Sequence, residues 1–300
     1  MSVDPTERAG VPAGAAEHLA AALAALDADA TRDAALPFLD LAAGYLTAAR
    51  AGEGPVSTAL PPAALAARFD EPVPRAGRPL AEVAARLGRD VLTDANRLHH
   101  PMYVGHQVSA PLPAAVWTEL VIAALNQSVA VSEMSPTATA VEGTVVRWMA
   151  DLAGFGPRAG GTLTSGGTEA TFAALLAARS RAIPDVWTDG VGAEPPVLVC
   201  GEHAHYAVAR AAGAMGLGLR AVVSVPSADG PRGHRMDAAA LARTLADLAA
   251  SGRRVMAVVA TAGSTATGAF DDLDAVADAC AAHDAWLHVD GAHGASALLS

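Results

Sequence analysis

A pair of glycines followed by a threonine begins a helical segment in the second half of the chain. Gly166 and Gly167 precede Thr168 and an alanine-rich stretch. A helix start of this kind presents backbone N–H groups and a hydroxyl, which together suit a phosphate. A glycine-rich turn in which Thr168 only caps the helix explains the segment equally well. The segment has neither the lysine of a P-loop nor the glycine spacing of the dinucleotide motif.

A carboxylate ends the apolar run from Trp286 to Asp290. Asp290 could hold a positively charged ring nitrogen or a metal ion. His288 and Asp290 face the same side of a strand. With His293 nearby, zinc, iron or manganese ligation is therefore geometrically allowed. Both readings stay open at this point.

Two further polar loops follow apolar runs. His203 and His205 come after the run that ends at Cys200. One of them could stack on a planar cofactor, both could bind a metal, and a plain polar loop is the alternative. Thr265 lies in a small-residue loop, where its hydroxyl could bind an anionic ligand. A strand-to-helix turn, with Asp271 or Asp272 near the next helix cap, is an equally good explanation.

His106 and Gln107 are polar side chains in an otherwise apolar run. They precede a predicted helix over residues 114–129. Taken alone, this segment is more typical of a surface turn than of a pocket.

The elements that position these residues alternate between strands and helices. Strands are predicted at 197–200, 221–225, 255–260 and 286–290, and amphipathic helices at 169–181, 206–217, 237–251 and 271–283. This order predicts an α/β fold with a mainly parallel sheet that carries helices on both faces. Ligands of such sheets bind at the carboxyl ends of the strands, where the polar loops lie.

The first part of the chain is predicted to be helical and rich in linkers. Residues 15–49 have helical spacing, and Pro37 is expected to start or break a helix there. Proline- and glycine-rich stretches at 52–62 and 72–79 flank a short helix at 62–69. We therefore divide the chain into a helical region, 1–95, and an α/β domain, 96–300.

Composition excludes several classes of protein. With 52% hydrophobic and 17% charged residues, the chain is not a disordered tail. Its net charge of −11 argues against a nucleic-acid partner. No window is apolar enough to span a membrane, and no secretory signal is visible, so we expect a cytoplasmic protein. Cys200 and Cys280 are too few for a disulfide framework and are expected to be reduced and buried.

The order of these segments resembles the group II pyridoxal-phosphate-dependent decarboxylases, which act on aromatic amino acids, glutamate or 2,4-diaminobutyrate. The resemblance runs from about His99 to Ser300. It is carried by Leu125–Ser128 with Ser135–Pro136, by Thr164–Ala170, by Ala204–Tyr206 and by His288–Ala292. It implies an incomplete large domain of fold type I, preceded by a helical region used in dimerisation, and a homodimer.

The resemblance also implies roles for individual residues. Gly167 and Thr168 would hold the phosphate of pyridoxal 5′-phosphate. His205 and Ala292 would cover the two faces of its ring, and Asp290 would pair with the ring nitrogen. This pairing would keep the ring nitrogen positively charged, and the positive charge lets the ring accept the electron pair that remains when carbon dioxide departs. Thr265 would place a hydroxyl near the cofactor. His106 and Gln107 would line the substrate pocket.

One feature departs from this family. All 20 residues in the combined lysine and arginine count are arginines. The family's Schiff-base lysine follows the His-Val-Asp segment within an Asp-x-His-Lys motif, which this chain does not contain. We therefore expect Ser300 to be a truncation point and the 300-residue piece to be inactive by itself.

The predicted reaction of the whole protein is decarboxylation of an L-amino acid to an amine and carbon dioxide. Three alternatives remain. One is an aminotransferase or another lyase on the same scaffold. Another is a non-catalytic pseudoenzyme fragment. The third is a metallohydrolase that uses His203, His205, His288, Asp290 and His293.

Overall fold

The computed structural model describes residues 15–228, 230 and 233–300. It divides into two compact units, one ending at Asn126 and one running from Gln127 to Ser300. The sequence pattern predicts a boundary between a helical region and an α/β domain at about residue 95. The division between compact units comes later along the chain, and the predicted roles of the two regions stay predictions.

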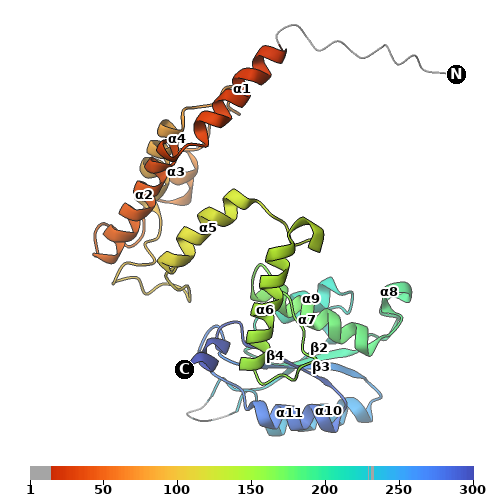
Figure 1. Ribbon diagram of the computed structural model, residues 1–300. Helices are drawn as coiled ribbons and strands as arrows, with labels where there is room; N and C mark the ends of the chain where they lie inside the picture. The colour runs from red at the N-terminus through yellow and green to blue at the C-terminus, as the bar shows by residue number, and fades with distance from the viewer. Residues whose placement is uncertain (1–14, 229, 231–232) are drawn as a thin grey trace, which may run out of the picture. The chain divides into compact units, whose positions relative to one another are not determined.

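The second unit contains a parallel sheet (Figure 1). Its strands are β1 (Val197–Gly201), β2 (Val222–Val225), β3 (Val255–Thr261) and β4 (Trp286–Asp290), in the order β2-β1-β3-β4. All pairings among them are parallel. Val197, Val199 and Val258 are fully buried, as expected for strands covered on both faces. The predicted α/β class is therefore confirmed.

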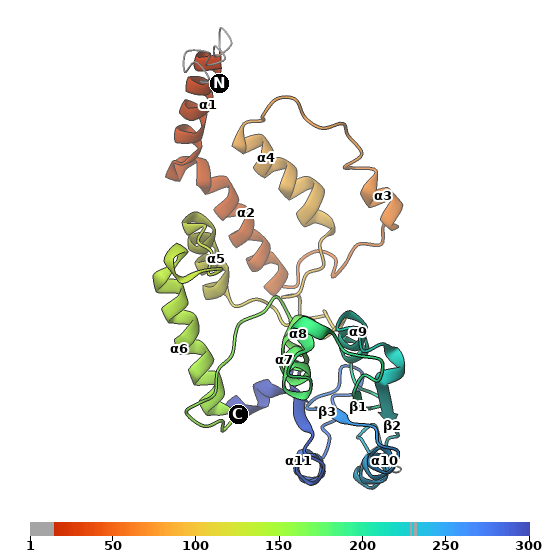
Figure 2. The ribbon, with the colours of Figure 1, turned by 90° about the vertical axis from the view of Figure 1, so that its right-hand side faces the viewer.

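Helices cover both faces of this sheet (Figure 2). On one face, α7 (Gly167–Ala182) and α9 (Ala207–Ala214) bury a core around Leu175 and Val208. On the other, α10 (Ala238–Ala250) and α11 (Leu273–Ala282) bury a core around Leu241. Cys200 belongs to the first core and Cys280 to the second, so the expectation that both are reduced core residues is confirmed.

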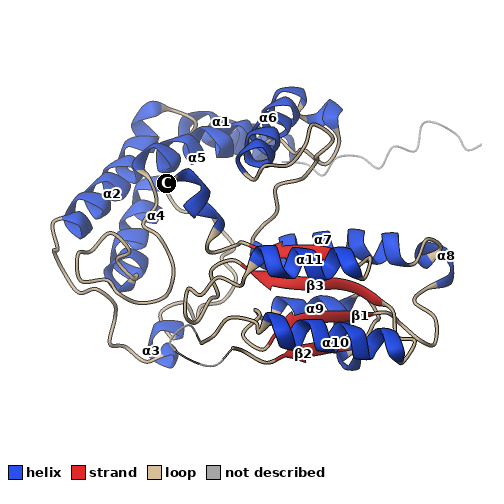
Figure 3. Cartoon of the chain, turned by 90° about the horizontal axis from the view of Figure 1, so that it is seen from below, coloured by secondary structure: helices blue, strands red, loops and turns tan. Residues whose placement is uncertain are grey.

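Other helical segments of the second unit are α6 and α8, with short 3-10 turns between the elements. Their bounds are Ser132–Met134 (3-10), Pro136–Leu152 (α6), Val186–Asp189 (α8), Leu219–Ala221 (3-10) and Ala295–Leu299 (3-10). Figure 3 shows the strands pointing in one direction, so their carboxyl ends share one edge of the sheet.

The first unit is helical where it is described. Its elements are α1 (Ala15–Asp29), α2 (Arg32–Arg50), α3 (Pro62–Ala66), α4 (Leu80–Arg86), a π-helical turn (Leu87–Val91), a 3-10 turn (Leu92–Asp94) and α5 (Pro113–Leu125). The expectation that Pro37 starts or breaks a helix is wrong, because Pro37 lies inside α2. The interruption comes at Thr31, whose hydroxyl caps α2 by accepting from the Ala34 N–H at 3.3 Å.

The helix predicted over 114–129 is shorter than expected. α5 ends at Leu125, because Asn126 takes the left-handed conformation with φ 45°. Asparagine tolerates this conformation and commonly ends helices in this way. Among the described residues, no helix has the length and apolar character that crossing a membrane requires.

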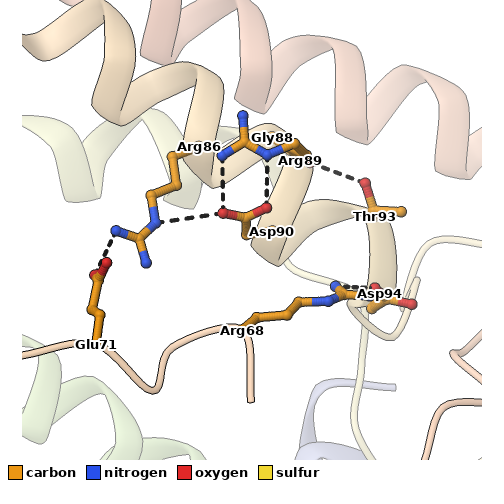
Figure 4. Close-up of polar contacts among 8 residues, drawn as sticks. All are labelled: Arg68, Glu71, Arg86, Gly88, Arg89, Asp90, Thr93 and Asp94. Carbon is orange, nitrogen blue, oxygen red and sulfur yellow. Dashed lines mark hydrogen bonds and ion pairs between the residues drawn. The ribbon is translucent and has the colours of Figure 1, made fainter. Parts of the chain in front are cut away.

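Charged side chains join the linker after α3 to the end of α4 and to the helical turns that follow it (Figure 4). Arg86 contacts Glu71 at 2.6 Å and Asp90 at 3.4 Å, and Arg68 pairs with Asp94. The pKa of Asp90 is held below its usual value chiefly by hydrogen bonds from Arg89. These pairs order a segment that contains few fully buried apolar residues.

Candidate functional site

The carboxyl ends of β1, β3 and β4 bring three loops to one edge of the sheet. Thr261, the last residue of β3, pairs with Asp290, the last residue of β4. The following N–H, of Ala262, donates to the Asp290 carbonyl at 2.8 Å. The loops that begin at Glu202, Ala262 and Gly291 therefore start from neighbouring positions.

The start of α7 approaches the loop after β4. A Cβ placed on Gly167 would lie 2.8 Å from the Cβ of Ala292, closer than two such atoms pack. Gly166, at the N-cap, has no side chain, so no side-chain hydrogen bond caps the start of α7. The structure therefore brings together Gly167 and Ala292, two residues predicted to lie in one site, and keeps the helix start free of side-chain bulk.

Glu169, in the first turn of α7, is directed toward the preceding turn. Its carboxylate accepts the Ser165 N–H at 2.8 Å and the Ser165 hydroxyl at 2.6 Å. These hydrogen bonds hold the pKa of Glu169 below its usual value. The glutamate thus fixes the turn that leads into the helix, and Thr168 lies half-buried beside it.

Asp290 is half-buried at the end of β4. Its Oδ1 accepts the Ala292 N–H at 3.1 Å, which fixes the carboxylate against the following turn. His288 lies two residues earlier, on the same face of the strand. Its Nε2 is buried, and no hydrogen-bond partner for it is found among the described residues. The pKa of the imidazole is lowered by burial, and the charge of the nearby Asp290 opposes this shift in part.

His205 lies in the loop after β1. Its Nδ1 accepts the Ala207 N–H at 3.2 Å, so this ring nitrogen carries no proton in that arrangement. The ring lies 4.0 Å from the Tyr206 ring, centroid to centroid, at a tilt of 38°. These contacts fix the orientation of the imidazole at the beginning of α9.

Thr265 lies in a tight loop between β3 and α11. The Gly263 and Ser264 N–H groups both donate to the Ala269 carbonyl, and the Ser264 and Thr267 hydroxyls are 2.6 Å apart. Thr265 is exposed near the tip of this loop. At its base, a Cβ on Gly263 would meet the Gly294 Cα at 2.8 Å, so the loops after β3 and β4 pack directly together.

The metal-centre alternative requires five side chains to converge, and the structure does not support it. His203 instead faces His234, with a distance of 3.3 Å between Nε2 and Nδ1. Across residues 15–228, 230 and 233–300, no group of three or more histidine, cysteine, aspartate or glutamate side chains is placed to hold a metal.

His106 and Gln107 lie in the first compact unit, in the exposed segment before α5. His106 has a left-handed backbone, with φ 48°. The predicted cofactor residues all lie in the second unit. The substrate-pocket role of His106 and Gln107 stays a prediction.

The role of Asp271 at this edge could not be predicted from the sequence. Asp271 and Asp272 were both candidates for the cap of the next helix. Only Asp272 caps α11, by accepting the Ala275 N–H at 3.1 Å. Asp271 is buried and accepts backbone N–H groups from Thr261 and Met236. No local sequence signal distinguishes it from the adjacent Asp272.

The chain is similar in sequence to known proteins. Residues 62–300 match the model of the pyridoxal-dependent decarboxylase conserved domain. The chain is 37% identical over 231 residues to L-2,4-diaminobutyrate decarboxylase of Rhizobium meliloti, covering 77% of this chain and 45% of that protein. It is 33% identical over 213 residues to cysteine sulfinic acid decarboxylase of Rattus norvegicus, covering 71% of this chain and 42% of that protein.

Solved structures show the same fold. The glutamate decarboxylase domain of a diaminobutyrate-pyruvate transaminase and L-2,4-diaminobutyrate decarboxylase from Vibrio parahaemolyticus aligns with a TM-score of 0.80 at 32% identity, over 87% of this chain and 58% of that one. Mouse cysteine sulfinic acid decarboxylase aligns with a TM-score of 0.79 at 30% identity, over 90% of this chain and 56% of that one. The chain thus spans about half the length of the curated relatives it matches. It belongs to the pyridoxal-dependent decarboxylase family.

Proposed function

We propose that this chain provides the cofactor-binding part of an enzyme that decarboxylates an L-amino acid to an amine and carbon dioxide. The observation that carries the proposal is the approach of Gly167 to Ala292, beside the Asp290 carboxylate. This approach puts an uncapped helix start and an acidic strand end at one edge of the sheet. Pyridoxal 5′-phosphate has an anionic phosphate and a basic ring nitrogen, which match these two features.

The start of α7 fits the phosphate. Backbone N–H groups of a first helical turn have no partner within the helix, and the helix dipole favours an anion there. Gly166 and Gly167 add no side chain, and the Glu169 carboxylate is held by Ser165. We propose that Thr168 adds a hydroxyl donor.

Asp290 fits the ring nitrogen. Its Oδ1 is held by the Ala292 N–H, and no other hydrogen bond to this carboxylate is found in the described part of the chain. A carboxylate beside the ring nitrogen keeps that nitrogen protonated. The bound cofactor supplies an electron sink for the bond that breaks. His205, oriented by the Ala207 N–H, and Ala292 are the residues that we place against the ring faces.

The absence of lysine limits what the chain does by itself. Without a lysine amine, no residue side chain in these 300 residues can form a Schiff base with the cofactor aldehyde. We therefore propose that the chain binds pyridoxal 5′-phosphate reversibly and does not turn over an amino acid.

For the whole protein we propose an amino-acid substrate with a polar side chain. His106 and Gln107 support a polar pocket, and relatives include decarboxylases of diaminobutyrate, aspartate and cysteine sulfinic acid. Product analysis separates this from transamination, because decarboxylation yields carbon dioxide and an amine whereas transamination yields a keto acid.

We also propose a cytoplasmic homodimer. Exposed leucines of α1, at Leu19, Leu23 and Leu26, recur at helical spacing and favour a covered face in an assembly. Two buried free cysteines on opposite faces of the sheet favour a reducing compartment.

The test of the cofactor proposal compares two carboxylate variants. Asp290→Asn keeps an oxygen that can accept the Ala292 N–H but removes the charge. We expect pyridoxal 5′-phosphate to bind about tenfold more weakly, as for loss of one charge-assisted hydrogen bond. Asp278→Asn, on the exposed side of α11, is the matched control and should leave the affinity unchanged. Equal affinity of the two variants, measured by equilibrium dialysis, would contradict the role of Asp290.

A further inference from the structure

The Asp271 carboxylate lies buried beneath the loops of the candidate site. Its Oδ2 accepts the Thr261 N–H at 2.7 Å and its Oδ1 accepts the Met236 N–H at 2.7 Å. The Asp271 N–H in turn donates to the Thr261 carbonyl at 2.9 Å. With 8% of the residue exposed, these donors have little access to water as a substitute. One side chain therefore joins two segments that are distant in sequence.

The bond to Thr261 fixes the base of the loop that carries Thr265. Ala262 and Phe270 form a bridge immediately beyond it, and the Ala262 N–H donates to the Asp290 carbonyl at 2.8 Å. A displacement of Thr261 would therefore move both the Thr265 loop and the strand end that carries Asp290.

The hydrogen bond to Met236 connects Asp271, through Met236 and its neighbours, to the loop that carries His205. Met236 pairs with Ser227, whose N–H donates to the Glu202 carboxylate at 2.7 Å. The Met236 side chain also covers the end of β1, because a Cβ on Gly201 would lie 3.5 Å from the Met236 Cβ. Glu202 and Gly201 directly precede the segment that leads to His205.

We propose that Asp271 is a positioning residue that sets the relative positions of the His205, Thr265 and Asp290 loops for cofactor binding. The proposal rests on the proposed function, since the loops matter through the cofactor that they would hold. Asp271 itself contacts neither cofactor nor substrate in this account. It acts through the Thr261 and Met236 N–H groups.

The experiment compares Asp271→Asn with two controls. The variant keeps the size of the side chain but replaces one accepting oxygen with an NH2 group, which faces an N–H donor. Asp272→Asn changes the neighbouring exposed carboxylate, which caps α11 and can still do so as asparagine. Val276→Ala removes buried volume from α11 and lowers stability without touching the loops.

Two measurements are made on each chain: residue-level amide hydrogen exchange and binding of pyridoxal 5′-phosphate. We expect Asp271→Asn to raise exchange at Thr261, Met236, Ala262 and Ala292, and to weaken binding about tenfold. Both controls should bind like wild type. The wild-type chain in low urea should lose protection at Thr261 and Met236 in one opening event, a check that needs no variant.

Four results would decide against the positioning role or, separately, against the proposed function. Unchanged exchange at Ala262 and Ala292 in Asp271→Asn, or separate openings of Thr261 and Met236 in wild type, would overturn the positioning role. If Val276→Ala weakened binding as much as Asp271→Asn does, the effect of Asp271→Asn on binding would be explained by lower stability. That result would also overturn the positioning role. No binding of pyridoxal 5′-phosphate by the wild-type chain would refute the proposed function, and exchange alone would then decide whether Asp271 joins the loops.

Discussion

At Gly167 the candidate site has no room for a side chain. Gly167→Ala would place a Cβ 2.8 Å from that of Ala292. We expect this clash to cost about 1–3 kcal/mol of unfolding free energy, more than the gain from removing a glycine from a helix. Gly166→Ala is the matched control, because its Cβ meets nothing within 4 Å. Urea denaturation of both variants checks the prediction, and equal stabilities would contradict it.

We expect the buried imidazole of His288 to make the stability of the chain depend on pH. Burial lowers the pKa of this imidazole from 6.5, so the folded chain binds the proton more weakly than the unfolded chain. The stability contributed by neutral His288 is present above about pH 6.5 and is lost as pH falls toward the folded-state pKa. His288→Leu removes this titration. We therefore expect its unfolding free energy to fall less than that of wild type between about pH 7.5 and about pH 5.5.

Denaturant titrations at both pH values measure the difference in slope. The value at about pH 7.5 is the internal control, because the imidazole is neutral there in both states. Parallel pH profiles for wild type and His288→Leu would show that His288 does not contribute to this dependence.

At the scale of elements, local signals in the sequence predicted most of the sheet. β4 begins and ends at the predicted residues, and β1 and β3 each extend one residue beyond the prediction. Apolar runs of strand length carry this information, because both faces of a parallel strand are buried. The order of the strands and the approach of Gly167 to Ala292 depend on crossovers and packing, which no single segment encodes.

The errors arose where one residue overrode a periodic pattern. Thr31 interrupts the first helical stretch through a cap hydrogen bond, whereas Pro37 is accommodated inside α2. Asn126 ends α5 through a left-handed backbone conformation within an apolar run. Asp271 and Asp272 look alike in sequence, and only the folded loop turns one of them inward.

The N-cap of α10 provides a prediction at this scale. The Asp237 side chain accepts the Ala240 N–H at 2.9 Å. Asp237→Ala should lower the free energy of unfolding by about 1 kcal/mol, because the Ala240 N–H in the first turn then loses its hydrogen-bond acceptor. Asp247→Ala, at an exposed position later in the same helix, should change it by less than about 0.5 kcal/mol. Equal effects in thermal denaturation would contradict the capping role.

At the scale of the whole molecule, the exposed leucines of α1 predict self-association. Leu23 is 52% exposed, between Leu19 and Leu26 on one face of the helix. Leu23→Glu should shift the chain from twice its own mass toward the monomer in sedimentation equilibrium. Ala21→Glu, toward the opposite side of α1, is the control and should leave the mass unchanged. A wild-type chain that sediments as a monomer at all concentrations tested would contradict the homodimer.

The central claim is that residues of this chain hold the phosphate of the cofactor at the start of α7. The measurement that tests it most directly is parallel equilibrium dialysis of the purified chain against pyridoxal 5′-phosphate and against pyridoxal, which lacks the phosphate. We predict saturable, reversible, one-to-one binding of the phosphate form and at least about tenfold weaker binding of pyridoxal. Equal binding of the two compounds, or no saturable binding of either, would contradict the account.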